Sequence, residues 1–524
     1  MSKEREQAER FGIPILDEIA HFPWVRDRVS LIPYIFAKQR KLLPLEETAK
    51  GITVALSDPM DLESLNELRL LLKKEIRPVF CAQTLLETAI ERCYHQNEEE
   101  TRRLFTDLEQ TDPQSAAQNG DALEGYDLLE QADQHPVIRM INVILIEAIQ
   151  QGASDIHFEP TDEGLAVRYR IDGVLLKRHT PPLEYLNQML TRIKVMAKMD
   201  IAEHRLPQDG RIKLRHGGRE IDFRVSTLPV VHGERIVLRI LDKGNVLLGL
   251  NRIGMDEKLL KSFRKLTHFP EGIILVTGPT GSGKTTTLYS AISEINAAEM
   301  NVMTIEDPVE YKLPGISQMN VNSKIELDFA RGLRHILRQD PDVIMIGEIR
   351  DRETAEIAIQ SSLTGHLVLS TLHTNDAPSA LTRLADMGIE PYLLASSILG
   401  ILAQRLVRRI CPSCKVGYTP SADELAELEL KREQLLEGKL YRGSGCDQCF
   451  GTGYKGRHGI YELMPVNSKI KAQVLKSQDA EELRRTAIKE EMITLFQRGA
   501  TLAAQGLTTS AEVLRVTRLG EEND

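Results

Sequence analysis

The chain has 524 residues, which at about 150 residues per domain predicts three or four domains and excludes a single small binding module. Hydrophobic residues make up 42% and charged residues 27%, an ordinary globular composition, and no apolar run of about 18 residues predicts a membrane span. Lys and Arg (66) against Asp and Glu (76) give a net charge of −10, so no basic excess favours nucleic acid as a partner.

The N-terminus and the cysteines bear on the cellular compartment. The first residues, MSKEREQAER, are charged where a secretion signal needs an apolar stretch, so we expect a cytoplasmic protein. In that reducing compartment, six cysteines predict metal ligands or reactive thiols in preference to disulfides.

Residues 1–95 predict a small first domain of α/β or α+β type. GITVAL at 51–56 and RPVF at 77–80 have the composition of strands. TLLETAIERCY at 84–94 has apolar residues at helical spacing. The alternation of strands and helices is typical of a compact unit with its own core.

Residues 96–135 differ in composition from the rest of the chain. They contain eleven acidic residues against Arg102 and Arg103, which gives a net charge of −9. The remaining residues are then nearly neutral, at −1. Few β-branched residues occur in this stretch, so we interpret it as a solvated linker.

Residues 136–245 predict a second, α+β domain. VIRMINVILIEAIQQ from 137 has a wide apolar stripe for a helix, and LAVRYRI from 165 alternates like a strand. Arginines recur on these strands, and a solvated strand face is an ordinary reason for such residues. Arg211, Arg224 and Arg235 are among these arginines.

Residues 246–405 predict an α/β core with a parallel-type sheet. Four short apolar runs suit strands that are buried on both faces, with helices between them. These runs are IILV at 273, VMTI at 302, VIMI at 343 and LVL at 367.

GPTGSGKT directly follows the first of these strands and precedes a helical pattern. In a P-loop, glycines turn backbone N–H groups toward phosphate oxygens. Lys284 would neutralise phosphate charge, and the Thr285 hydroxyl would ligate Mg²⁺. We therefore expect an ATP-binding loop made of Gly278, Pro279, Thr280, Gly281, Ser282, Gly283, Lys284, Thr285 and Thr286.

Two acidic residues end neighbouring strands and are candidates for orienting water or Mg²⁺. Glu306 follows VMTI, and Glu348 follows VIMI. We favour Glu306 as the general base, with Glu348 supporting Mg²⁺ or water. Acidic residues after strands are also typical of solvated turns.

His366 and His373 stand at either end of the strand in TGHLVLSTLHTND. Either histidine could sense or stabilise the γ-phosphate. A hydrogen-bonded structural histidine is the ordinary alternative at both positions.

Four cysteines form two CxxC pairs, CPSC and CDQC. Two such pairs predict a closed tetrahedral zinc site with a structural role, because no position remains for water. A redox pair is the alternative. The expected ligands are Cys411, Cys414, Cys446 and Cys449, within an insert at 406–456, and a helical part follows at 457–524.

The ordered motifs GPTGSGKTTTLY, TIEDPVEY, RQDPDVIMIGEIRD and TGHLVLSTLHTNDA resemble the secretion ATPase superfamily of type II secretion and type IV pilus motors. The resemblance extends to GASDIHFEP at 152 and GTGYKGRHGIYEL at 451. It covers residues 137–520 and, more weakly, the first domain. It implies a RecA-like P-loop core with the smaller domains before it.

This resemblance also implies a function. A homo-hexamer would hydrolyse ATP with Mg²⁺ to power pseudopilus assembly and protein export, acting on an inner-membrane platform protein. The first domain would dock onto an inner-membrane assembly protein, holding the motor at the membrane periphery without a span of its own. The alternatives are a pilus-extension ATPase, which also carries the cysteine insert, and a nucleotide-gated scaffold without turnover.

The resemblance assigns the matching residues. Glu306 lies in the acidic box and Glu348 in the second Walker motif, while His366 and His373 form the histidine box. Arg211, Arg224 and Arg235 match arginines that the family directs toward the γ-phosphate.

Overall fold

A computed structural model describes most of the chain from residue 136 onward and part of the chain before it. The described residues are 3–16, 37, 40–48, 51–61, 64–66, 68–69, 74–94, 136–216, 219–242, 249–295 and 299–517. They form two compact units, Met1–Gly244 and Asn245–Asp524. The linker expected at 96–135 lies outside the described residues, and the finer domain boundaries stay a prediction. Among the described helices, none is long and apolar enough to cross a membrane.

The first unit begins with a small mixed sheet. Its strand order is β1-β4-β3-β2, with β1 and β3 parallel to β4 and with β2 antiparallel to β3. Leu42, Val54 and Leu86 are among the side chains of its own apolar core. The elements are α1 (Lys3–Arg10), β1 (Ile15–Leu16), β2 (Leu42–Thr48), β3 (Gly51–Leu56), β4 (Ile76–Cys81) and α5 (Gln83–Tyr94). The strands and helix expected here are confirmed.

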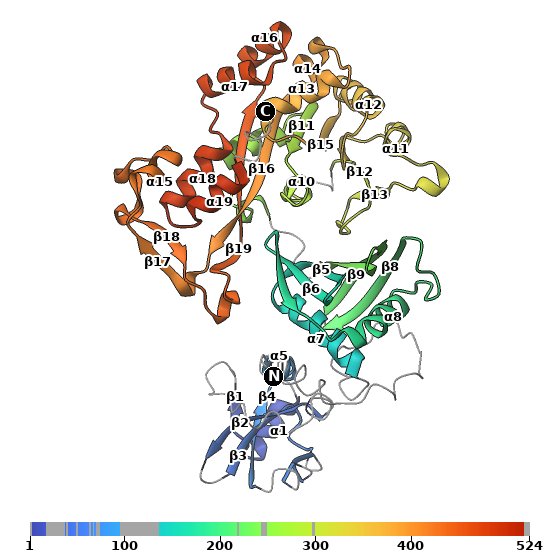
Figure 1. Cartoon of the computed structure of the whole chain (residues 1–524), viewed down its shortest axis with the longest axis vertical. Helices are drawn as coiled ribbons and strands as arrows, with labels where there is room; N and C mark the ends of the chain where they lie inside the picture. Colours follow the sequence, from blue (N-terminus) through green and yellow to red (C-terminus); the bar gives the residue numbers. More distant parts are fainter. Residues whose placement is uncertain are drawn as a thin grey trace. The chain divides into compact units, whose positions relative to one another are not determined.

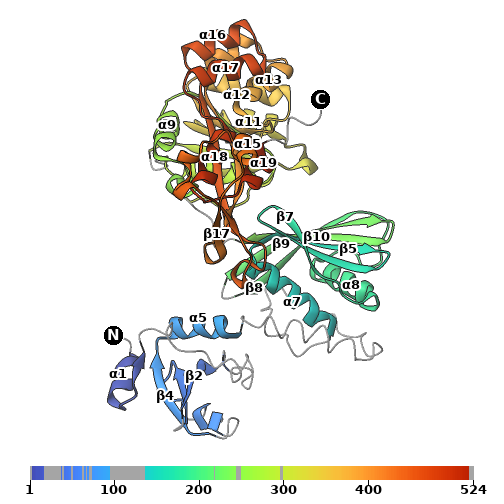
Figure 2. The same cartoon turned by 60° about the vertical axis from the view of Figure 1, so that its left-hand side comes forward.

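A six-stranded antiparallel sheet follows in the same unit, in the order β7-β6-β5-β10-β9-β8. Alternate residues such as Phe158, Phe223 and Leu238 point to one face, where they pack with α7 and α8 (Figures 1 and 2). The other face is left for charged residues. The elements are α7 (Pro136–Gln150), β5 (Ala153–Thr161), β6 (Gly164–Ile171), β7 (Val174–His179), α8 (Leu186–Met196), β8 (Gln208–His216), β9 (Arg219–Val230) and β10 (Gly233–Asp242).

The second unit is built on a seven-stranded sheet in the order β13-β12-β14-β15-β11-β16-β19. All neighbouring pairs are parallel except β16 and β19. The strands are β11 (Gly272–Thr277), β12 (Val302–Glu306), β13 (Ser317–Asn320), β14 (Val343–Ile346), β15 (Leu367–Leu372), β16 (Ile398–Ile410) and β19 (Tyr454–Pro465). The α/β fold is confirmed.

Helices cover both faces of this sheet, which explains why the strands read as continuous apolar runs. Ile273 and Leu275 pack with one set of helices, whereas Ile274 and Val276 pack with another. The first set includes α11 (Phe329–Ile336), α12 (Arg352–Leu363), α13 (Ala377–Asp386) and α14 (Pro391–Ser397). The second set is α9 (Glu257–Thr267) and α10 (Lys284–Ile292). Every second residue therefore faces a different core.

The long strands β16 and β19 form an antiparallel ribbon that extends beyond the sheet (Figure 1). Beyond β16 lies a small module with a two-stranded sheet. Its elements are β17 (Lys415–Tyr418), α15 (Ala422–Glu427) and β18 (Leu440–Gly443). The chain then returns through β19 to α16 (Ser468–Lys476), α17 (Ala480–Lys489), α18 (Leu495–Ala504) and α19 (Ser510–Thr517).

Candidate functional site

The loop after β11 depends on glycine. Gly278, Gly281 and Gly283 have φ angles of 147°, 79° and 89°, which residues with a Cβ adopt only with strain. A Cβ on Gly278 would also lie 2.4 Å from the carbonyl oxygen of Gln404. The chain therefore needs glycine where it leaves the strand, and Gly283 leads directly into α10.

Lys284 is the first residue of α10 and is only 9% exposed. Its Nζ donates to the carbonyl oxygens of Gly278 at 2.8 Å and Pro279 at 3.1 Å. Burial lowers the pKa of Lys284 to about 8, and the negative charge of Glu348 partly opposes this shift. Because these carbonyl partners are neutral, the positive charge of Lys284 remains available to bind an anion. Backbone N–H groups at the start of the helix would add to the binding of that anion. Thr285, next to Lys284, is exposed.

Glu348 and His373 meet at the edge of the sheet where the loop lies. They follow β14 and β15, whose carboxyl ends adjoin that of β11 because these strands are parallel. Glu348 Oε2 lies 3.1 Å from His373 Nε2. Arg350 forms an ion pair with Glu348 and lies 3.8 Å from Asp307. The structure thus brings together a carboxylate, an imidazole and the charge of Lys284.

Glu306 has a different environment and is only 3% exposed. Tyr289 donates a hydrogen bond to Oε2, and Thr304 donates to Oε1 at 2.5 Å. Gln318 Nε2 also donates to Oε1, at 3.1 Å. Burial, with Glu306 beside it, raises the pKa of Tyr289 and keeps its hydroxyl protonated. The carboxylate of Glu306, which the sequence favours as the general base, therefore already accepts hydrogen bonds from three side chains.

The two histidines lie at opposite edges of the sheet. His373 follows β15 on the side of the glycine loop, whereas His366 precedes β15 and its carbonyl oxygen accepts from Gly272 N at 3.1 Å. His366 Nδ1 lies 2.9 Å from the carbonyl oxygen of Ser361. The seven positions from His366 to His373 separate the two residues by about 23 Å of extended strand. The structure does not bring His366 to the loop of its own chain.

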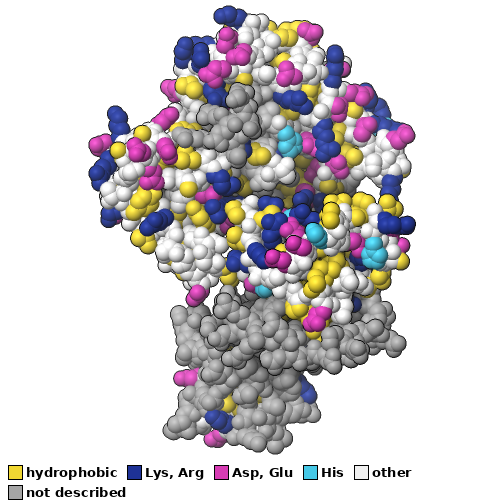
Figure 3. Space-filling view, viewed as in Figure 1, with side chains coloured by type: hydrophobic (Ala, Val, Ile, Leu, Met, Phe, Trp, Pro, Cys, Tyr) yellow, Lys and Arg dark blue, Asp and Glu magenta, His cyan; other side chains and the backbone are white. Residues whose placement is uncertain are grey.

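The three arginines expected at the site belong to the first unit. Arg211 pairs with Arg224 across β8 and β9, and Arg224 pairs with Arg239 across β9 and β10, so these residues form a row on one face. Arg235 lies 2.7 Å from Glu159. Figure 3 shows basic, acidic and histidine side chains interleaved on the surface of the domain that contains these strands. The charged face is the one that α7 and α8 leave uncovered.

Arg235 also donates to His157 Nδ1 at 3.1 Å. Burial and the positive charge of Arg235 lower the pKa of His157. The imidazole is therefore a neutral acceptor at neutral pH, and Arg235 is held between it and Glu159.

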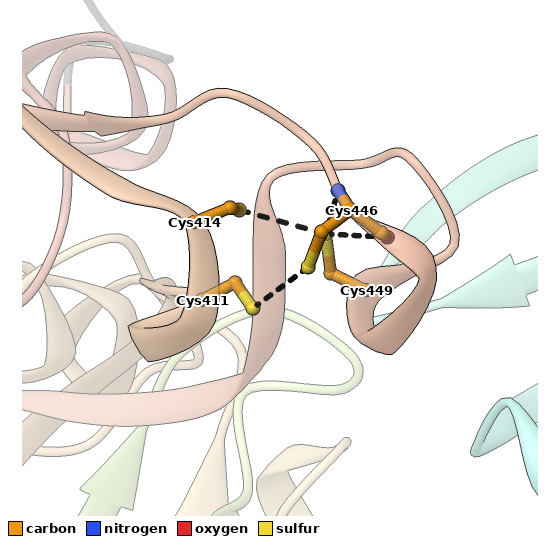
Figure 4. Close-up of side chains that lie close together, drawn as sticks. All are labelled: Cys411, Cys414, Cys446 and Cys449. Carbon is orange, nitrogen blue, oxygen red and sulfur yellow. Dashed lines mark hydrogen bonds between the residues drawn. The ribbon is translucent and has the colours of Figure 1, made fainter.

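The four cysteines converge from two short turns at the end of the β16–β19 ribbon (Figure 4). Their sulfur atoms all lie within 4.8 Å of one another. Cys411–Cys446 and Cys414–Cys449 are 3.8 Å apart, and Cys446–Cys449 are 3.7 Å apart. A tetrahedron with Zn–S bonds of about 2.3 Å has edges of about 3.8 Å, so the spacing fits zinc.

The surroundings of Cys449 favour its thiolate more than those of an ordinary cysteine do. Burial would raise the pKa of Cys449, but backbone N–H groups of Cys446 and Gly453, each 3.2 Å from the sulfur, contribute to lowering it to about 7. Metal ligation requires thiolates, so this arrangement suits a ligand.

Sequence reasoning missed three residues that shape the site. Gln404 contacts the glycine loop from β16, Tyr289 contacts Glu306 from α10, and Arg350 contacts Glu348. Gln404 had one usable signal, because it is a polar residue within the apolar run GILAQRLV. The sequence around Tyr289 and Arg350 gives no such signal, because ordinary buried or solvated residues occur at positions of the same kind.

Comparisons with known proteins show which proteins this chain is similar to. The chain is 44% identical to the "Type II secretion system ATPase E" of Vibrio cholerae over 96% of this chain and all of that protein. It is 42% identical to the "Type IV pilus assembly ATPase PilB" of Myxococcus xanthus over 97% of this chain and 89% of that protein. The solved structure of the Yersinia pseudotuberculosis ATPase DotB matches 74% of this chain and 94% of that chain, with a TM-score of 0.54 and 22% identity, and supports the fold.

Two family matches divide the chain. Residues 11–100 match the MshEN domain, and residues 130–515 match the family described as Type II/IV secretion system protein. The second match covers most of the chain and includes the glycine loop, Glu348 and the four cysteines. The chain is therefore a member of the type II/IV secretion system protein family, with an MshEN domain at its N-terminal end.

Proposed function

We propose that this chain hydrolyses ATP to power protein export by a type II secretion system. The observation that carries the proposal is the buried Lys284 within a glycine loop, at the same sheet edge as Glu348 and His373. Family membership supplies the context, because relatives with this architecture are named as secretion ATPases. A pilus-assembly motor is the second candidate, supported by the similarity to PilB.

In the proposed reaction, water attacks the γ-phosphorus of ATP and ADP leaves. Lys284 and the amides at the start of α10 would hold the β- and γ-phosphates. Mg²⁺, when bound beside the exposed Thr285 hydroxyl, would neutralise phosphate charge. Glu348 would orient and deprotonate the water, and His373 would orient Glu348.

This assignment moves the base from Glu306 to Glu348. Glu348 contacts His373 and its charge raises the pKa of Lys284, whereas Glu306 accepts hydrogen bonds from three side chains, two of which are buried. We propose a positioning role for Glu306, which would fix the start of the segment that contains Asp307. His366 has no proposed role at the phosphates of its own chain.

We further propose that chains assemble as a homo-hexamer and that Arg211, Arg224 and Arg235 stabilise transition-state charge. Their shared sheet face supports this role, since it places the guanidinium groups outside the apolar core. The motor would act on an inner-membrane platform protein. A scaffold that binds ATP without turnover is the remaining alternative, and the turnover measurements below distinguish it.

Lys284→Ala should lower kcat for ATP by about a hundredfold or more, because it removes the cation beside the phosphates. Steady-state phosphate release measures the loss. Lys258→Ala is the matched control, since Lys258 is 78% exposed and pairs with an exposed glutamate. Turnover of Lys284→Ala at the control's rate, with an unchanged melting temperature, would contradict the assignment of the loop.

Glu348→Gln should lower kcat by about a hundredfold while leaving the Kd for ADP nearly unchanged, because the amide keeps the shape and loses basicity. Glu306→Gln should retain more turnover than Glu348→Gln. Single-turnover hydrolysis and ADP titration of both variants test this order. The reverse order, with both variants folded, would return the role of base to Glu306.

The tetracysteine site should hold one zinc ion per chain with a structural role. Replacing Cys411 and Cys446 by serine should abolish zinc binding, whereas Cys81→Ser should not, because Cys81 lies in the core of the first domain. Elemental analysis of freshly purified protein measures the metal. Loss of zinc should unfold the insert locally and leave the core sheet folded. Protein that contains no zinc, even after reconstitution, would refute the site.

Residues 1–95 should dock onto the cytoplasmic domain of an inner-membrane assembly protein. Their separate core and the MshEN match support a self-contained docking domain. Deleting them should abolish co-purification with that partner and block export, while the Kd for ADP stays within about twofold because the phosphate loop is untouched. A truncated chain that still fractionates with membranes and supports export would exclude this role.

A further inference from the structure

The side chain of Gln404 connects β16 to the glycine loop and to α10. Gln404 is only 2% exposed and stands one residue beyond Ala403, which pairs with Thr277 at the end of β11. Gln404 therefore lies level with the point at which the loop begins. The residues around it on β16 are apolar or buried, so its amide must find partners within the fold.

The amide uses its donor and its acceptor on opposite sides of Lys284. Nε2 donates to the carbonyl oxygen of Ser282 at 2.7 Å, before the lysine. Oε1 accepts from the Thr287 hydroxyl at 2.7 Å, after the lysine and within α10. Thr287 is itself fully buried. A single side chain thus fixes the loop relative to the first turn of the helix.

The backbone and amide of Gln404 also limit the space around the loop. A Cβ on Gly278 would lie 2.4 Å from the Gln404 carbonyl oxygen, and a Cβ on Gly283 would lie 2.8 Å from its Nε2. Gly278 is therefore required by contact with the Gln404 backbone as well as by its φ angle, whereas a Cβ on Gly283 would displace the Gln404 amide. Gln404 therefore packs directly against the glycine loop and limits the conformations that the loop can adopt.

We propose that Gln404 is a positioning residue for phosphate binding, because its amide holds Ser282 and Thr287 so that the loop is preformed around Lys284. This inference rests on the proposed function, since it concerns the same phosphate site. It adds a residue from a strand that carries none of the proposed catalytic groups. A preformed loop binds phosphate without first losing conformational freedom.

Only an amide satisfies both partners. A methionine of similar length supplies neither hydrogen bond, and a glutamate accepts from Thr287 but cannot donate to a carbonyl group. A glutamate would also place a negative charge beside the phosphates. Gln404→Glu should therefore bind ADP more weakly than Gln404→Met.

The test is a double-mutant cycle on the full-length chain, with ADP and ATP as the probes. Gln404→Met should raise the Kd for ADP and the KM for ATP about tenfold, the effect of losing two buried hydrogen bonds. Its kcat should change less than about threefold, because Gln404 is not proposed to touch phosphate. Thr287→Val should give part of the same defect, and Thr287→Ser should restore near-normal affinity.

The double variant should bind ADP no more weakly than Gln404→Met alone, because both changes remove one shared interaction. Gln360→Met, on the exposed side of α12, is the matched control and should change neither constant. A Kd for Gln404→Met within twofold of the wild-type value, or additive effects in the cycle, would overturn the inference. If Gln404→Met does not fold, the comparison of Thr287→Val with Thr287→Ser decides.

The two proposals fail in distinguishable ways. A wild-type chain that binds ADP but releases no phosphate from ATP would refute the proposed hydrolysis. The ADP titrations would still test Gln404, because phosphate binding does not need turnover. Normal wild-type turnover together with an unchanged Gln404→Met variant would refute only the role of Gln404.

Discussion

The common direction of six neighbouring strands is the constraint on which the site depends. Strands β13, β12, β14, β15, β11 and β16 run parallel, so their carboxyl ends lie along one edge of the sheet. The glycine loop, Glu348 and His373 each follow one of these ends. Strand direction also places His366 at the other edge, although it lies only seven positions before His373. Proximity in sequence therefore says little about proximity to the phosphate loop.

Burial gives the gathered groups their chemical character. Lys284 loses water, and its pKa falls to about 8, because the surrounding sheet and helices exclude solvent. Glu306 is buried too, but three donors compensate it. Among the described residues, the ammonium group of Lys284 donates to neutral carbonyl groups, whereas the carboxylate of Glu306 already accepts from three donors. Lys284 and Glu306 are both buried, but we propose different roles for them because their hydrogen-bond partners differ.

Much of this arrangement could be predicted from the sequence. The apolar runs at 273, 302, 343 and 367 identified strands buried on two faces, and the helices between them formed as expected. The CxxC spacing predicted a cluster that the structure brings together. These features depend on local pattern, or on residue types with few alternative uses.

The contacts that refine the site could not be predicted in this way. Gln404 is distant in sequence from Ser282 and Thr287, and its role appears only when β16 lies beside β11. Tyr289 of α10 and Glu306 of β12 meet only once the helix packs against the sheet. Such partners are set by tertiary packing, which residue spacing within a single segment does not encode.

The β16–β19 ribbon has the geometry of a lever. Gln404, near its base, forms a hydrogen bond with Ser282 of the glycine loop. Cys411 lies seven residues further on, directly after the end of β16, at a distance of about 23 Å at 3.3 Å per residue. A rotation of about 5° at the base would displace the cysteine end by about 2 Å over that length. Zinc bound to the four cysteines would cross-link the two turns, so a rotation at the base would displace these turns together as one unit.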